Sequence, residues 1–371
     1  MQFNANGKFK ILLLADVQDS YPLEKDIIAF INETLDKTKP DLVVFLGDII
    51  MTPKINNTQE EYLKAYDELL EPLVSRKIPF SLVFGNHDQE KMPSMTLEEK
   101  LAKYMSYEGC LAYDADPSLH GTGTHNLEIK SSDGTKTAFN LWFMDSGDYA
   151  YDKKGNKFYD CVRKDQIKWY EEKSKQLEAE NGQKVMSVMF QHIVTAEIAK
   201  KVMVTLPFHI GKLARSNMTD GSAITYLPNI FGIKSGYAFE CLGNSRDNDG
   251  QWDAISKRGD VLVCFFGHDH NNTYKATVKG VDGIAIHSCT YRAYHDDRYQ
   301  GAALLTIDEN DTSKYQLDYI YSNDLALEKG SILPTLSRDR LNYEKSRAKR
   351  IRTDKLLNLA HKVTGVFKKN S

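Results

Sequence analysis

Five short polar clusters contain the side chains of this sequence that could do chemistry. They are Asp16-Val17-Gln18, Gly47-Asp48, Gly85-Asn86-His87-Asp88, Gln191-His192 and Gly267-His268-Asp269-His270. Carboxylate and amide oxygens suit hard divalent ions such as Mn or Mg, and imidazoles suit borderline ions such as Zn, Fe or Mn. A carboxylate such as Asp48 can give one oxygen to each of two cations. A cation pair shifts bound water toward hydroxide and neutralises phosphoryl charge, so these donors indicate phosphoester hydrolysis.

The segments that precede the clusters are short and apolar, as buried strands are. These segments are Ile11–Ala15, Leu42–Leu46, Phe80–Phe84, Val185–Phe190 and Val261–Phe266. Helical patterns at 23–35, 58–74 and 96–107 follow the first three and predict βαβ units with parallel strands. Ligand-binding residues of α/β folds gather beyond the carboxyl ends of the strands, so clusters far apart in sequence can meet in one crevice.

The remaining segments predict a second set of strands and an insert. Strand-like patterns lie at His125–Ile129, Ala138–Met144, Thr273–Val278, Gly283–His287, Ala302–Ile307 and Gln316–Tyr321, with a charged helix at Lys164–Glu180. The segment 196–260 is irregular and rich in Gly, Asn, Asp and Ser. Long irregular inserts between site motifs are often functional, so we predict a substrate-facing lid here.

Because clusters from Asp16 to His270 must meet, we predict one catalytic domain at 1–335 and a basic tail at 336–371. Residues 338–371 contain eleven Lys and Arg against three Asp and Glu, a surplus of +8. The net charge of -3 therefore leaves -11 on the rest of the chain. An acidic body lacks the basic footprint of a dedicated nucleic-acid surface, which favours a small phosphorylated substrate.

The tail contains apolar residues at helical spacing with Lys and Arg between them. They are Leu356, Leu359, Ala360, Val363, Val366 and Phe367. A basic amphipathic helix of this kind could make weak contact with an anionic membrane surface. The alternative, which we favour, is a helix docked on the acidic body.

Cysteine usage and the start of the chain predict a cytoplasmic protein. Five cysteines are an odd number without a CxxC pair, which is typical of reduced, buried thiols. The first residues have no basic n-region, and Ile11–Ala15 is too short for a signal segment.

Taken in order, the five clusters resemble the motifs of the calcineurin-like metallophosphoesterases: Asp-x-His, Gly-Asp, Gly-Asn-His-Asp or -Glu, a lone His and Gly-His-x-His. Three stretches, 84–88, 140–149 and 266–272, look like the purple-acid-phosphatase-like branch. The resemblance runs from about Phe9 to Ile307. It implies a four-layer α/β/β/α sandwich of two mixed sheets, which the segment pattern alone does not separate from a doubly wound sheet.

Position by position, the resemblance implies a ligand set for two metals. Asp16 and His270 would hold the first metal, Asn86, His192 and His268 the second, and Asp48 both. His87 would contact the phosphoryl or leaving-group oxygen beside Asn86, and Asp88 would orient His87. Outside the motifs, Arg292 and His295 could form a substrate wall, or a plain surface loop.

Two positions depart from the family pattern. Gln18 stands where the motif usually has a second ligand histidine, and its carbonyl oxygen is a weaker, harder donor. Direct metal contact by Gln18 would weaken the first site and favour Mn over Fe, Zn or Mg. The alternatives are a contact of Gln18 with a ligand residue rather than with the metal, and a contact with substrate. Some members similar to Mn-dependent ADP-ribose and nucleotide-alcohol pyrophosphatases also have Gln here. Met51 stands where true purple acid phosphatases place their coloured tyrosinate, so we predict a colourless enzyme.

The leading hypothesis is a metal-dependent phosphoesterase in which a metal-bound hydroxide attacks a small phosphomonoester or phosphodiester. The alternatives are a catalytically silent scaffold of the same fold, and a nucleotide pyrophosphatase or nuclease. His87 and the nearly complete ligand set argue against a scaffold. The lack of a basic concentration outside the tail argues against a nuclease.

Overall fold

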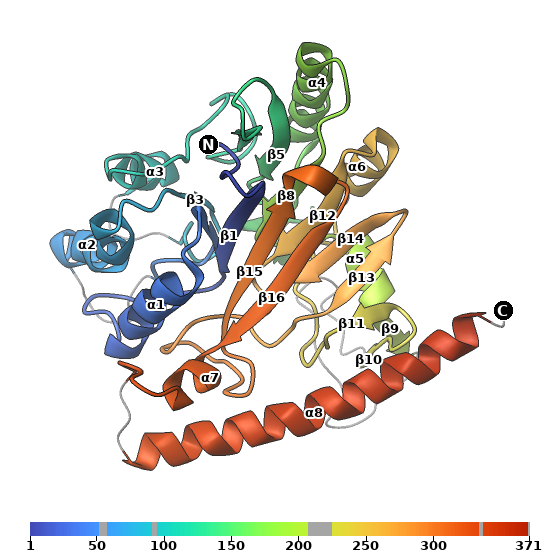
Figure 1. Cartoon of the computed structure of the whole chain (residues 1–371). Coiled ribbons are helices and arrows are strands. Elements are labelled where there is room, and N and C mark those ends of the chain that lie inside the picture. Colours follow the sequence, from blue (N-terminus) through green and yellow to red (C-terminus); the bar gives the residue numbers. More distant parts are fainter. Residues whose placement is uncertain (52–57, 91–94, 207–224, 334–336, 370–371) are drawn as a thin grey trace.

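The structure, a computed structural model, describes the chain except for residues 52–57, 91–94, 207–224, 334–336 and 370–371 (Figure 1). Two large sheets lie face to face in the middle of the molecule, and helices cover their outer faces. A long C-terminal helix runs along one edge.

The first sheet contains the strands that lead into the Asp16, Asp48 and Asn86 loops. Its order is β16-β15-β1-β2-β3, with β1, β2 and β3 parallel and β15 antiparallel to both of its neighbours. The bounds are β1 Lys8–Leu14, β2 Leu42–Leu46, β3 Phe80–Val83, β15 Gly301–Asp308 and β16 Tyr315–Tyr321. Parallel strands place their carboxyl ends at one edge of the sheet, so these three loops lie together.

The second sheet contains the strands that lead into the His192 and His268 loops. Its order is β11-β13-β14-β12-β8-β5-β4, with a parallel centre from β14 to β5 and antiparallel outer strands. The bounds are β4 His125–Lys130, β5 Thr137–Phe143, β8 Ser187–Gln191, β11 Ile233–Ser235, β12 Val261–Phe266, β13 Lys275–Val278 and β14 Val281–Ala285.

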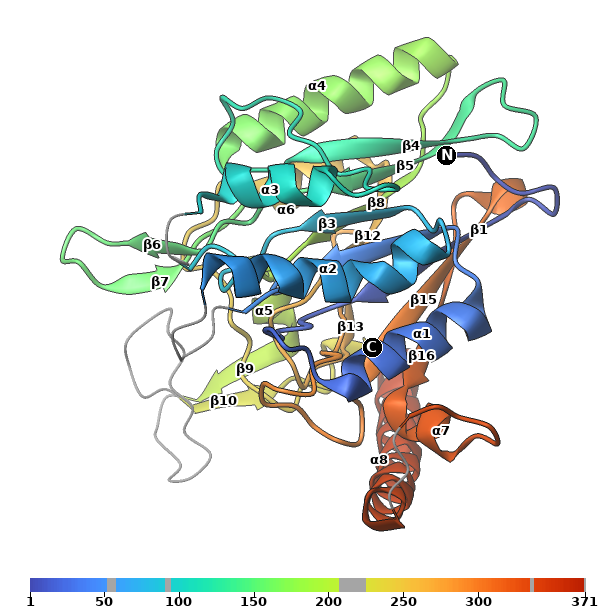
Figure 2. The ribbon, with the colours of Figure 1, turned by 90° about the vertical axis from the view of Figure 1, so that its left-hand side faces the viewer.

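Successive residues of β1 face two different hydrophobic cores. Ile11 and Leu13 pack between the sheets, whereas Leu12 and Leu14 pack against the outer helices, because strand side chains alternate between faces. The first sheet is covered by α1 Lys25–Thr38, α2 Gln59–Ser75, α3 Leu97–Met105 and α7 Ser322–Leu327. The second is covered by α4 Lys164–Asn181, α5 Ala196–Val202 and α6 Gln251–Arg258. The predicted α/β/β/α sandwich is therefore confirmed (Figures 1 and 2).

Helices α2 and α3 begin at capping boxes that are visible in the sequence. Thr58 accepts the backbone N–H of Glu61, and the Glu61 carboxylate accepts the N–H of Thr58. Thr96 and Glu99 repeat this exchange. Each box satisfies two backbone donors of the first turn, which fixes where the helix starts.

The prediction of an irregular segment at 196–260 is wrong for part of the described chain. Its described parts contain α5, α6, β11 and the pair β9 Met203–Leu206 and β10 Thr225–Pro228. The sequence of helix α6 shows no clear helical periodicity, because only Trp252 and Ile255 among its eight residues have buried apolar side chains. The middle of the predicted lid, 207–224, lies outside the described residues.

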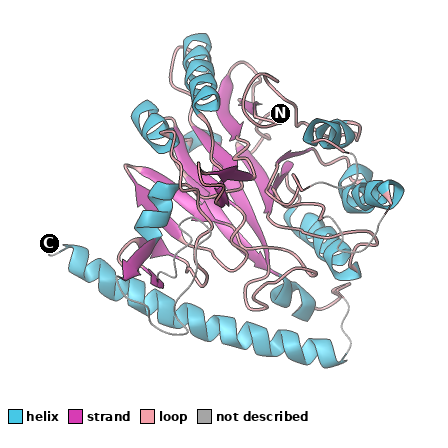
Figure 3. Cartoon of the chain, turned by 180° about the vertical axis from the view of Figure 1, so that it is seen from behind, coloured by secondary structure: helices cyan, strands magenta, loops and turns pink. Residues whose placement is uncertain are grey.

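The C-terminal helix α8, Ser337–Lys369, is docked on the body (Figures 1 and 3). Arg350 Nη2 lies 2.6 Å from Asp324 Oδ2, and the Tyr299 hydroxyl donates to Asp354 Oδ1 at 3.0 Å. These contacts support the docked alternative, and membrane contact stays a prediction. Within the described residues, no helix combines the length and apolarity needed to cross a membrane.

A buried histidine links the edges of the two sheets and gives a pH prediction. His125 of β4 contacts Ser81 Oγ of β3 at 2.8 Å and the Gly123 carbonyl at 2.7 Å. Burial lowers the pKa of His125 from 6.5 to about 4, so protons bind the unfolded state first as pH falls. We expect this residue's contribution to the free energy of unfolding to decline by about 2 kcal/mol between pH ~7.5 and ~5.

The measurement is urea unfolding of metal-free parent and His125→Asn proteins at both pH values. The stability difference between them is expected to shrink at the lower pH, because only the parent loses the histidine contribution. A difference that does not change with pH would contradict the prediction.

Candidate metal centre

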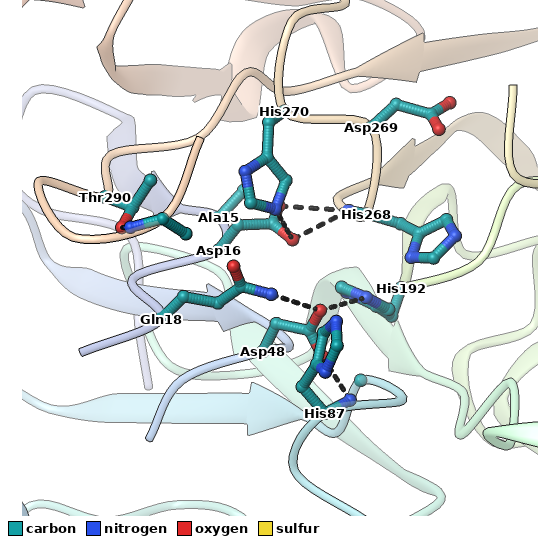
Figure 4. Close-up of polar contacts among 12 residues, drawn as sticks. Ala15, Asp16, Gln18, Asp48, His87, His192, His268, Asp269, His270 and Thr290 are labelled. Atoms are coloured by element: carbon teal, nitrogen blue, oxygen red, sulfur yellow. Dashed lines mark hydrogen bonds and ion pairs between the residues drawn. The ribbon is translucent and has the colours of Figure 1, made fainter. Parts of the chain in front are cut away.

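The five sequence clusters converge where the carboxyl ends of both sheets meet. Asp16, Asp48 and His87 follow β1, β2 and β3, while His192 follows β8 and His268 follows β12. Figure 4 shows their side chains directed toward one another, with Asp48 in the middle. Residues separated by up to 254 positions in the chain therefore form one cluster.

Four residues of this cluster have left-handed backbone conformations. Their φ angles are 49° at Asp16, 40° at Gln18, 51° at Asp48 and 72° at His268. Only three other non-glycine residues with positive φ are found in the described chain. Such conformations are costly for most residues and collect at functional sites, where surrounding structure enforces them.

One half of the cluster could hold a metal through Asp48, His192, His268 and Asn86. Donor atoms of Asp48, His192 and His268 lie within 4.8 Å of one another. The Asn86 amide donates to the Tyr149 hydroxyl at 3.0 Å, and its buried Oδ1 has no hydrogen-bond partner among the described residues. A buried carbonyl oxygen without a partner is costly unless a cation or another donor reaches it.

Two histidines present a ring nitrogen to a carboxylate. His192 Nδ1 lies 2.7 Å from the Leu46 carbonyl, and His192 Nε2 lies 3.2 Å from Asp48 Oδ2. His270 Nδ1 lies 2.6 Å from the Tyr294 carbonyl, and His270 Nε2 lies 3.5 Å from Asp16 Oδ1. A carbonyl only accepts, so Nδ1 carries a proton in both rings. In the neutral ring, the Nε2 lone pair then faces a carboxylate oxygen, an arrangement that a cation between them stabilises.

The charges of the cluster favour a cation. Burial raises the pKa of Asp16 well above its usual range. Burial alone would lower the pKa of His192, but the charge of Asp48 outweighs it and raises that pKa to about 10. A buried imidazole holds a proton so tightly only in a strongly negative field, and the same field attracts metal ions.

Glycines give the ligands room. A Cβ at Gly85 would lie 2.2 Å from Asp48 Oδ1 and 2.7 Å from His192 Nε2. A Cβ at Gly47 would lie 2.5 Å from His192 Nδ1. A side chain at either glycine would collide with a proposed ligand, which explains why glycine precedes Asp48 and Asn86. Taken together, the carboxylate, amide and imidazole donors of the cluster fit a pair of divalent ions.

Gln18 lies between the two halves of the cluster. Its Nε2 donates to Asp48 Oδ2 at 3.0 Å, which turns the carbonyl oxygen toward Asp16 and His270 (Figure 4). The residue is buried. Its position beside Asp16 and His270 is compatible with the predicted role as a ligand of the first metal.

The structure changes the expected role of Asp88. Its carboxylate accepts the backbone N–H groups of Ile49 at 2.8 Å and Gly85 at 2.9 Å, so it ties the β2 and β3 loops together. The His87 ring instead contacts Glu90, with 2.9 Å between Nδ1 and Oε1. The expectation that Asp88 orients the His87 ring is therefore corrected: Asp88 fixes the backbone, and Glu90 contacts the imidazole.

The two candidates for a substrate wall are engaged elsewhere. The Arg292 guanidinium pairs with Asp19 at 2.6 Å and with Glu24 at 3.2 Å. His295 Nε2 lies 3.1 Å from Asp297, beside α8. Neither side chain contacts the Asp48 cluster within the described structure, and their substrate contact stays a prediction without support from these distances.

Sequence analysis missed a hairpin that brings aromatic residues to the cluster. It consists of β6 Tyr149–Tyr151 and β7 Lys157–Tyr159. The rings of Tyr149 and Tyr159 stack at 5.6 Å, and Tyr159 meets the His268 ring edge-on at 4.4 Å. Alternating aromatic residues on both sides of the Gly155-Asn156 turn are a hairpin signal that could have been used.

We expect Tyr149→Phe to weaken metal binding at the Asn86 side of the cluster by about tenfold, the lower end of the range for lost supporting hydrogen bonds. The hydroxyl receives the Asn86 amide and thereby fixes which way the carbonyl oxygen points. Equilibrium dialysis with metal analysis measures the affinity. The exposed Tyr151 of the same strand gives a matched control, Tyr151→Phe. Equal affinities in the two variants would contradict this role.

Comparison with known proteins agrees with this geometry. A family model described as calcineurin-like phosphoesterase matches residues 9–272. "Probable inactive purple acid phosphatase 29" of Arabidopsis thaliana is 27% identical, over 79% of this chain and 75% of that protein. "Phosphatase DCR2" of Saccharomyces cerevisiae is 31% identical, over 46% of this chain and 32% of that protein.

A solved structure of a dimetal phosphatase from Danio rerio has the same fold. Its TM-score is 0.50 with 15% identity, covering 85% of this chain and 96% of that one. The matched residues include all five motifs, from Asp16 through His270. The chain therefore belongs to the calcineurin-like phosphoesterases, in the purple-acid-phosphatase-like branch of that superfamily.

Proposed function

We propose that this protein hydrolyses a small phosphomonoester or phosphodiester at a dinuclear metal site. The observation that carries the proposal is the set of imidazole nitrogens and carboxylate oxygens that face one another around Asp48. Asp16, Gln18 and His270 would hold one ion, Asn86, His192 and His268 the other, and Asp48 both. Bound divalent ions supply an activated water and neutralise charge on the phosphoryl group.

His87 is the residue best placed to act on substrate. Its backbone N–H donates to Asp48 Oδ1 at 2.8 Å, which fixes it beside the cluster, while its side chain is 37% exposed. With Nδ1 directed at Glu90, Nε2 is left for a phosphoryl or leaving-group oxygen. We propose that His87 stabilises charge on that oxygen or gives it a proton.

A silent scaffold is the second candidate, because a similar protein from Arabidopsis thaliana carries the name "Probable inactive purple acid phosphatase". A scaffold has no need for a buried ligand atom without a hydrogen-bond partner, such as Asn86 Oδ1. It also has no need for left-handed backbone at four ligand positions. These features cost stability, and they support a working metal site.

The test is hydrolysis of p-nitrophenyl phosphate and bis-p-nitrophenyl phosphate by protein whose metal content has been measured. Loading with Mn, Fe, Zn or Mg in turn identifies the best ion, and we propose Mn because of Gln18. Turnover of either ester is expected. Fully loaded protein that turns over neither would favour the scaffold.

Two further proposals rest on charge and composition. The acidic body favours a small substrate over nucleic acid. Single-stranded DNA incubated with the metal-loaded protein is therefore expected to remain intact. The five cysteines are all free in the structure, which supports a reducing, cytoplasmic location; imaging of the tagged protein tests it.

A further inference from the structure

A groove of about 860 Å³ lies between α8, the loop at 295–298 and Asn271, and none of the proposed metal ligands lines it. Lys345, Lys349 and Arg352 line it from the helix, and residues 295–298 line it from the loop. Positions i, i+4 and i+7 share one side of an α-helix, so the three cations form a continuous stripe. The metal-site chemistry described above does not use any of them.

The three cations differ from other basic residues of α8 in their pairing. Arg347 and Arg350 both form ion pairs with Asp324 on the body. Lys345, Lys349 and Arg352 are exposed and form no ion pair with any residue that the structure describes. Lys349 acts on Asp297 through its charge without a close ion pair, so most of the positive charge of these three residues is left for a ligand.

The acidic residues of the groove are already compensated. Asp296 is held by Arg298, whose Nε lies 2.8 Å from Oδ1 and 3.0 Å from Oδ2. Asp297 lies 3.1 Å from His295 Nε2. The loop carboxylates therefore have partners of their own, and the surplus positive charge of the groove comes from the helix.

We propose that this groove binds a phosphate-rich anion through Lys345, Lys349 and Arg352. A seven-residue separation covers about 10 Å of helix, which suits a ligand with two or more phosphate groups rather than a single phosphate. Lysine and arginine bind such groups with charge-assisted hydrogen bonds. Free polyphosphate compounds and the headgroups of polyphosphorylated lipids share this chemistry.

The groove shares a loop with the proposed first metal site. The Tyr294 carbonyl accepts a hydrogen bond from His270 Nδ1–H. The His270 and Tyr294 rings stack with their centroids 4.2 Å apart and an angle of 5° between their planes. His295 follows directly in the chain and lines the groove. An anion bound here would contact the segment that positions His270. An effect of the anion on the metal site rests on the proposed function, whereas binding of the anion does not.

The test compares calorimetric binding of inorganic tripolyphosphate to the full chain and two double variants. Lys345→Gln/Lys349→Gln removes two groove charges, and Lys355→Gln/Lys362→Gln removes two exposed charges of the same helix outside the groove. We expect the groove variant to bind about tenfold or more weakly and the control variant to bind like the parent. Polyphosphate that occupied the metal centre would bind all three proteins alike.

A second arm distinguishes the two sources of the anion. Sedimentation with phosphatidylcholine vesicles, with or without phosphatidylinositol bisphosphate, measures headgroup binding. Loss of binding in the groove variant with either probe supports the site, and the probe that binds identifies the source. No binding of either probe, or equal binding by both variants, would overturn the proposal, whatever the phosphoesterase assays show.

Discussion

Asp48→Asn is expected to reduce kcat by about 10³-fold and to lower the metal content of the protein. The Asp48 carboxylate reaches both halves of the cluster: Oδ2 lies 3.2 Å from His192 Nε2 and 3.0 Å from the Gln18 amide nitrogen. The variant loses the negative charge and leaves one oxygen where there were two. Removing a single preorganised stabilising group from an active site already costs 10²–10³ in kcat, and a shared ligand supports two metals.

The backbone is expected to tolerate this change. Asp48 has φ 51°, and asparagine adopts left-handed conformations at least as readily as aspartate. The loss can therefore be assigned to the charge rather than to a distorted loop. Elemental analysis and circular dichroism of the same preparation separate the two causes.

A second buried carboxylate provides the control. Asp260 accepts the Ser174 hydroxyl at 2.6 Å at the amino end of β12, the opposite end from His268. Asp260→Asn is expected to lower stability but to keep both metals and kcat. If Asp48→Asn retained parental metal content and kcat, the bridging role would be wrong.

The strands that position the site could be predicted because their boundaries are chemically sharp. The predicted bounds of β2, Leu42–Leu46, and β12, Val261–Phe266, agree with the structure at both ends. Both strands lie inside the sandwich, so an unbroken apolar run gives way abruptly to Gly47-Asp48 and Gly267-His268. The same abruptness marks which residues stand at the carboxyl ends of the sheets.

Side-chain partners outside these motifs could not be predicted, because they depend on tertiary contacts rather than on local pattern. Glu90, not Asp88, contacts the His87 ring, yet both carboxylates stand close to His87 in the sequence. Tyr149 reaches Asn86 only because the short β6–β7 hairpin folds over the cluster. Arg292 pairs with Asp19, which lies 273 residues away in the sequence.

His87→Asn is expected to reduce kcat by about 10²–10³-fold while metal content stays at the parental level. The ring is directed at Glu90 and not at a neighbouring ligand, and the backbone N–H that donates to Asp48 remains in the variant. Steady-state kinetics and elemental analysis of one preparation measure both quantities. An undiminished kcat would exclude His87 from the reaction.

The leaving group shows which role His87 has. A proton donor matters most for a poor leaving group, so general acid catalysis predicts a larger loss with phenyl phosphate than with p-nitrophenyl phosphate. Electrostatic stabilisation of a phosphoryl oxygen predicts equal losses with the two esters.

Glu90 supplies a graded control for the same residue. Glu90→Gln keeps an oxygen that can accept the Nδ1 proton at 2.9 Å, whereas Glu90→Ala removes the acceptor and frees the ring to rotate. If Glu90 acts only through His87, Glu90→Ala should lower the activity of the parent protein. The same substitution should cause no further loss in the His87→Asn protein. Additive losses in the double variant would show instead that Glu90 contacts substrate or solvent in its own right.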